Sequence, residues 1–200
     1  MKYHSYSAGA VKLAFWFTEF RRTIRLLSEG KTYADIKLMV TNENLYETAT
    51  PARAKQIYNT ITSRIKELDS SVYSLFLRSD LPSQKLIALT AVMALDTLFF
   101  EFMYEVVREK FILGVDELTD TDVSIFFKHK RVQDEKVAAW TDQTLKRLGN
   151  TYRGILYEAG LLVNNKAPHK LIRPILDPEL EQWLRANKME AVVKILLGGR

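Results

Sequence analysis

The chain has 200 residues, of which 47% are hydrophobic and 26% charged, which is the balance of an ordinary globular protein. It contains no cysteine, which excludes disulfides and zinc–thiolate sites. The first residues lack the order of a signal peptide, and the most apolar run, Leu86–Phe100, is too short for a bilayer span and carries Asp96. We therefore expect a cytoplasmic protein that does not enter a membrane.

The net charge of +5 is unevenly distributed along the chain. Residues 1–68 hold 11 Lys and Arg against 6 Asp and Glu, and residues 141–173 hold 6 against 2. The segment between residues 69 and 140 is acidic, with 8 basic residues against 12 acidic ones. Two basic segments around an acidic centre indicate two surfaces that face anions, unless they are only solvated helix faces.

Three helices are expected in the first basic segment. Apolar residues at three- and four-residue spacing predict a helix over Val11–Glu29, and Thr32 is the expected N-cap of a second. Thr50 and Pro51 predict the start of a third, which runs to about Leu68. Two helices, a linker and a basic helix form a helix-turn-helix candidate. The polar residues of the third helix that we expect to meet DNA are Arg53, Lys55, Asn59 and Arg64.

The central segment is expected to form the core. A short helix over Val72–Arg78 precedes the longest one, which begins at Asp80 or Leu81 and runs to about Phe111. Its middle is apolar on nearly all sides, which is typical of a buried helix. Asp96 lies within it and needs an arginine or hydroxyl partner, because a lone buried carboxylate is costly.

The second basic segment resembles the second half of a winged helix-turn-helix. A helix capped by Thr119 or Thr121 and a helix starting at Thr141 are followed by Leu161–Val163, a turn, and Lys170–Ile175, which predict two strands. We therefore expect a mainly α fold with helix-turn-helix-like elements and a small C-terminal β-hairpin wing. The expected domains are a helix-turn-helix-like unit (1–70), central helices (71–115) and a winged-helix-like unit (116–200).

This helix and hairpin carry the residues that we expect to bind nucleic acid. Gln and Asn can hydrogen-bond base edges, whereas Lys and Arg meet phosphates or guanine. The candidates on the Thr141 helix are Gln143, Lys146, Arg147, Asn150 and Arg153, and those on the hairpin are Lys166, His169, Lys170 and Arg173. Because basic residues outnumber candidate base readers, we expect binding to duplex DNA mainly through phosphates, with low sequence specificity.

No pattern typical of catalysis or of metal binding is present. His4, His129 and His169 are far apart, and there is no glycine-rich phosphate loop. Glu101, Glu105 and Glu109 share one helix face, which is more typical of a solvated acidic surface than of a metal site. We expect a protein that is not an enzyme and that uses no cofactor, metal or small-molecule substrate.

Several segments taken together resemble the BrxA family of bacteriophage-exclusion (BREX) defence systems. They include the opening YSAGAVK, the segment ATPARAKQIYNTITSRIKEL, the long apolar helix from Lys85, and TLKRLGNTYRGILYEAGLL. The resemblance spans nearly the whole chain. It implies a mostly helical, non-enzymatic accessory protein of a phage-resistance locus that binds double-stranded DNA and works beside other BREX components.

Two alternatives stay open from the sequence. One is RNA binding by a basic helical bundle, although few exposed aromatic residues are expected in the basic helices. The other is a protein adaptor that docks other defence components through the acidic centre or through the apolar helix over Met189–Leu197.

Overall fold

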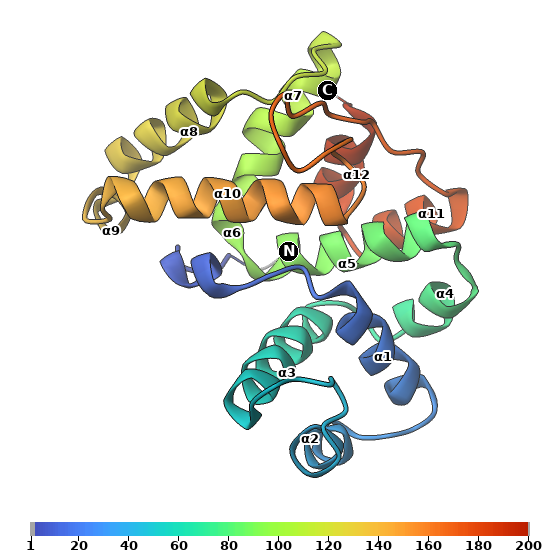
Figure 1. Cartoon of the computed structure of the whole chain (residues 1–200). Helices are drawn as coiled ribbons and strands as arrows, with labels where there is room; N and C mark the ends of the chain where they lie inside the picture. The colour runs from blue at the N-terminus through green and yellow to red at the C-terminus, as the bar shows by residue number, and fades with distance from the viewer. Residues whose placement is uncertain (1–2, 200) are drawn as a thin grey trace.

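The computed structural model describes residues 3–199, and within that range it contains helices and no β-strand (Figure 1). The expectation of a mainly α fold is confirmed. In chain order the helices are η1 (Ala8–Lys12), α1 (Phe17–Ser28), α2 (Tyr33–Asn42), α3 (Pro51–Lys66), α4 (Val72–Arg78), α5 (Leu81–Leu95), α6 (Thr97–Phe102), the π-helical η2 (Met103–Val107), α7 (Arg108–Leu113), α8 (Asp120–Gln133), α9 (Glu135–Ala138), α10 (Asp142–Glu158), α11 (Pro178–Ala186) and α12 (Glu190–Leu197).

The helices form two groups that meet at α5. Helices α1 to α4 gather on one side, and α6 to α10 lie on the other, with α5 running between them (Figure 1). From Leu86 to Ala94 every residue of α5 is buried, as its apolar sequence predicts. Its core is continuous with that of both groups. The predicted division at residues 70 and 115 remains a prediction.

Asp96 breaks the long central helix, so the prediction of one helix from residue 80 to 111 is wrong. Its backbone is extended, and its Oδ1 accepts a hydrogen bond from the amide of Phe99 at 3.0 Å, which caps α6. The chain bends by 115° between α5 and the segment Thr97–Leu113. No single helix within residues 3–199 has the length and apolarity to cross a bilayer, and only this bent pair matches the criterion together.

The caps that the sequence predicts are present. Thr32 and Asp35 form a reciprocal capping box at α2, and Thr50 accepts from the amide of Arg53 at the start of α3. The first helix, however, is shorter than the predicted Val11–Glu29. Leu13 after η1 is extended, Trp16 adopts a left-handed conformation, and α1 begins only at Phe17.

The predicted β-hairpin wing is absent, so this part of the fold prediction is wrong. Within residues 3–199, the segments near residues 117, 162 and 171 make only two isolated antiparallel bridges, Glu117 with Lys170 and Leu162 with Leu171. The amide of Val163 donates to the Lys170 carbonyl at 2.9 Å, but the pairing goes no further along the loop. The apolar run of three residues is too short for a ladder, and Pro168 offers no amide to extend it.

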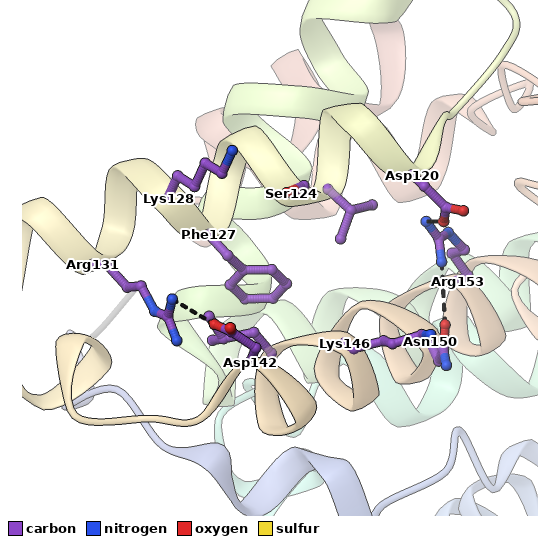
Figure 2. Close-up of a pocket in the computed structure, with 11 residues that line it drawn as sticks. Asp120, Ser124, Phe127, Lys128, Arg131, Asp142, Lys146, Asn150 and Arg153 are labelled. Atoms are coloured by element: carbon purple, nitrogen blue, oxygen red, sulfur yellow. Dashed lines mark hydrogen bonds and ion pairs between the residues drawn. The ribbon is translucent and has the colours of Figure 1, made fainter.

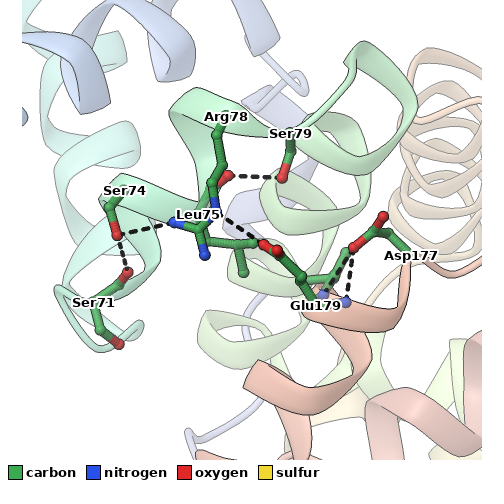
Figure 3. A network of polar contacts seen from close by, with 8 residues as sticks. Ser71, Ser74, Leu75, Arg78, Ser79, Asp177 and Glu179 are labelled. Carbon is green, nitrogen blue, oxygen red and sulfur yellow. Dashed lines mark hydrogen bonds and ion pairs between the residues drawn. The ribbon is translucent and has the colours of Figure 1, made fainter.

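Polar contacts tie the C-terminal helices to the N-terminal group (Figure 3). Arg78 at the end of α4 donates through Nε to Glu179 of α11 at 2.8 Å. The carboxylate of Asp177 caps α11 by accepting from the amide of Glu179 at 2.8 Å, and Trp183 donates to the Ser71 hydroxyl at 2.9 Å. These contacts fix α11 against α4, whereas α12 packs on α7 and η2, so that the chain ends beside α7 (Figure 1).

Candidate functional site

A groove runs between α8 and α10, with a volume of about 540 Å³ (Figure 2). Its floor is apolar and consists of Val123, Phe127 and Leu145. Its charged rim consists of Asp120, Lys128, Arg131, Asp142, Lys146 and Arg153. A second hollow of about 400 Å³ shares Asn150 and Arg153 with it and is bordered by the loop residues Asn165, Lys166, Ala167 and His169. Together they make one surface, which we call the α8–α10 groove.

Local sequence explains why these two helices lie so close. Thr119 and Asp122 form a capping box at the start of α8, and Thr141 accepts from the amide of Thr144 at the start of α10. Gly149 faces α8, where an added Cβ would lie 2.7 Å from Cγ1 of Val123. A glycine at this position therefore permits the close approach.

Both arginines of the groove are held by aspartates from the opposite helix. Nη1 of Arg131 on α8 lies 2.6 Å from Oδ1 of Asp142 on α10. Arg153 on α10 pairs with Asp120 on α8 and also donates to Asn150 at 3.2 Å. The sequence predicts Arg153 as a free DNA contact, but the structure places it in a buried, paired position.

The lysines of the groove, in contrast, are exposed and have no acidic partner. Lys128, Lys146 and Lys166 make no ion pair with any residue between 3 and 199. Lys146 and Lys166 are among the predicted candidates, and Asn150 lies exposed between them. The predicted residues Lys146, Asn150 and Lys166 are thus brought together on one face.

The remaining candidates of this segment are dispersed around the groove. Gln143 and Arg147 are exposed on α10 but do not line it, and Lys170 is exposed beyond the loop. His169 borders the second hollow and is half-buried. Arg173 is exposed, and one of its guanidinium nitrogens donates to the carbonyl of Phe111.

The predicted surface on α3 is less basic than its sequence indicates. Lys55 and Asn59 are exposed one turn apart. Arg53 lies over the ring of Trp16 at 4.9 Å and donates to Gln56 at 2.8 Å. Neither contact is to an acid, so Arg53 and Lys55 are both exposed cations without an ion pair within residues 3–199.

Arg64 is a buried structural residue. It is 3% exposed, and its Nη1 donates to the carbonyl of Phe15 at 2.8 Å. Burial lowers the pKa of its guanidinium to about 10, against the opposing effect of Asp96 and Glu158. Burial likewise raises the pKa of the Asp96 carboxyl. Arg64 therefore cannot contact DNA from this position, and it supplies the arginine that the sequence predicts near Asp96.

Lys128 and Arg131 are not among the predicted candidates, because the polar stretch KHKRVQDEK at residues 128–136 predicts only an exposed helix or loop. In the structure α8 continues through it to Gln133. Val123, Phe127 and Lys130 share the buried face of α8. A search for apolar spacing misses this continuation of the helix, because the third of these positions is a lysine. Lys130 is buried and pairs with Glu101 at 2.7 Å and Glu105 at 2.6 Å, so those carboxylates are not simply solvated.

Within residues 3–199, no three His, Cys, Asp or Glu side chains lie in a metal-binding arrangement. The groove instead has two kinds of cation around a small apolar floor. The arginines Arg131 and Arg153 are held in place by aspartates, and the lysines Lys128, Lys146 and Lys166 are free to move. Such an arrangement can bind an anion.

A family model and two curated relatives match this chain over nearly its whole length. The BrxA family matches residues 4–188. The BREX protein BrxA of Bacillus cereus (strain H3081.97) is 38% identical over 182 residues, which cover 91% of both chains. The BREX protein BrxA of Paramagnetospirillum magneticum (strain ATCC 700264 / AMB-1) is 24% identical over 192 residues, which cover 94% of this chain and 92% of the relative.

A crystal structure of an uncharacterized protein from Magnetospirillum magneticum has the same fold. It superposes with a TM-score of 0.83 at 20% identity, over 98% of this chain and 100% of that one. The family match, the relatives and the fold agree over nearly the full length. The chain therefore belongs to the BrxA family of BREX phage-defence systems.

Proposed function

We propose that this protein binds duplex DNA, mainly through its phosphates, at the α8–α10 groove. One observation carries the proposal: Lys128, Lys146 and Lys166 lie around one continuous groove without acidic partners in residues 3–199. Lysine heads are mobile point charges that suit phosphate contacts, and each contact releases counterions. This role requires no catalytic group and is that of a binding protein.

Low sequence specificity follows from the same surface. Asn150 and Gln143 are the exposed side chains of α10 with amide groups that read base edges. The contacts of Lys128, Lys146 and Lys166 would fall on the backbone, which carries no sequence information. Binding is therefore expected to depend strongly on salt and weakly on sequence.

The structure gives less support to the alternatives. The apolar face of α12, on which the adaptor hypothesis rests, is covered by the protein itself, since Val192, Val193, Ile195 and Leu196 are buried. In the acidic centre, Glu101 and Glu105 are engaged by Lys130. For single-stranded RNA, the groove offers one aromatic ring, Phe127, and that ring is buried in its floor.

The test is a titration of the K128Q/K146Q/K166Q variant with a duplex of mixed sequence at several salt concentrations. Loss of three phosphate contacts should weaken binding by about 10- to 100-fold near 0.1 M salt and reduce the salt slope by up to about three units.

The matched control is K31Q/K37Q/K188Q, which makes the same change in net charge at exposed lysines that do not line the groove. It should bind nearly as the unmodified chain does. Equal affinity of the two triple variants would overturn the groove assignment, and stronger competition by an RNA of the same sequence would favour RNA instead.

A further inference from the structure

Two reciprocal ion pairs cross the α8–α10 groove. At one end Asp120 of α8 holds Arg153 of α10, and at the other Arg131 of α8 holds Asp142 of α10 (Figure 2). In each pair the two residues come from opposite helices. The groove is thus closed at both ends by a carboxylate bound to a guanidinium.

The two partners of each pair differ sharply in exposure. The side chains of Asp120 and Asp142 are 91% and 90% exposed, whereas those of Arg153 and Arg131 are 8% and 32% exposed. An ion pair with one well-solvated partner contributes little to stability. The carboxylates can therefore leave at small cost, while the arginines are built into the protein.

Each guanidinium has a second acceptor that keeps it oriented. Arg131 donates from Nη2 to the carbonyl of Trp140 at 2.7 Å, and Arg153 donates from Nη1 to Oδ1 of Asn150 at 3.2 Å. These acceptors stay in place when an aspartate turns away. The arginines would then present a positioned guanidinium, which binds phosphate more strongly than a flexible ammonium does.

The spacing of the pairs suits two phosphates. Asp120 and Arg131 are eleven residues apart on α8, as are Asp142 and Arg153 on α10, which is about three helical turns or 16 Å. One phosphate group cannot span that length, so each arginine would need a phosphate of its own. Between the two ends lie Lys128 and Lys146.

We propose that Arg131 and Arg153 are two phosphate subsites for DNA, which Asp142 and Asp120 occupy in the free protein and leave when DNA binds. This inference rests on the proposed function, since it names how that groove receives the backbone. The aspartates act as internal competitors of the phosphodiester. In the absence of DNA they neutralise the charge of the two guanidiniums. They also lower the affinity of these sites for anions that bind more weakly than a phosphodiester.

The test is the pair of substitutions Asp120→Asn and Asp142→Asn, titrated with the same duplex. Because an exposed pair contributes up to about 1 kcal/mol, each substitution should tighten binding by about two- to fivefold. The salt slope should steepen by up to about one unit for each site, because the displaced carboxylate no longer takes up a cation. Thermal unfolding monitors the fold of both variants.

Two control substitutions distinguish the replacement of aspartate by phosphate from a general gain of positive charge. The first control is Glu190→Gln. Like Asp120 and Asp142, Glu190 is the first residue of its helix and pairs with an arginine, in this case Arg185. Unlike them, it does not line the groove. Glu117→Gln removes an acid next to Lys170 that has no ion pair within residues 3–199. Both controls should change affinity by less than the aspartate variants do.

A second readout uses the unmodified protein. In nitrogen-15 spectra of arginine side chains, added DNA should shift the resonances of Arg131 and Arg153 and leave Arg185 in place. If the unmodified chain binds DNA but the aspartate variants gain no more than Glu117→Gln, or these resonances do not move, the exchange is overturned. If the unmodified chain does not bind DNA, the proposed function itself fails.

Discussion

The α8–α10 groove and the outer face of α3 look alike in sequence and differ in structure. Both are helical regions that carry Lys and Arg, and the sequence predicts that α3 and the α10 side of the groove face DNA. On α3, Arg64 is buried and Arg53 lies over the ring of Trp16, so Lys55 is the one lysine among the predicted contacts there. Around the groove three lysines are free and two arginines are held by displaceable acids.

In these two regions the arginines make contacts within the protein, whereas the lysines remain exposed to solvent. The arginine fork makes several directed hydrogen bonds, so arginines hold a helix to a loop segment, as Arg64 and Arg173 do through backbone carbonyls. The groove lysines Lys128, Lys146 and Lys166, each with one mobile charge, stay at the surface, whereas Lys130 is buried between two glutamates. A count of basic residues in the sequence therefore overstates the anion-binding surface where an arginine is buried against a backbone carbonyl, as Arg64 is.

The largest effect is expected from Arg64→Leu. It leaves the Phe15 carbonyl without its donor and Asp96 without a nearby positive charge, which should lower the free energy of unfolding by about 3 kcal/mol. Urea denaturation measures the loss. DNA affinity of the folded fraction should stay unchanged, and a variant as stable as the original would contradict the structural role.

A smaller loss is expected from Gly149→Ala. The new methyl group would press on Val123, which should reduce stability by about 1–2 kcal/mol despite the better helix propensity of alanine. Adding Val123→Ala should restore part of the loss, which a double-mutant cycle in urea would detect. Additive losses in the two variants would argue against this helix contact.

The smallest effect is expected on the α3 face. The variant K55Q/N59A should weaken duplex binding by less than about threefold, because it removes at most one phosphate contact. A fluorescence anisotropy titration beside K128Q/K146Q/K166Q compares the two surfaces directly. A loss on α3 as large as that in the groove would show that the two faces contribute equally.

Local features were predictable from sequence, and features that depend on distant partners were not. Thr32, Thr50 and Thr141 cap the helices that they were expected to cap, because a cap needs only its own next few residues. The break at Asp96 was missed because apolar residues continue on both sides of it. Inward arginines also escaped prediction, since Arg153 and its partner Asp120 are 33 residues apart.

The contacts of the N-terminal segment also bear on synthesis. The amide of His4 donates to the Thr97 hydroxyl, and Tyr6 donates to Glu101 at 2.7 Å, over separations of 93 and 95 residues. A ribosome adds about 5–20 residues per second, so this segment waits roughly 5–20 s for its partners to be made. Its tyrosines stay exposed to chaperones and proteases during that interval, and the translation speed over the whole stretch from this segment to α6 sets how long it lasts.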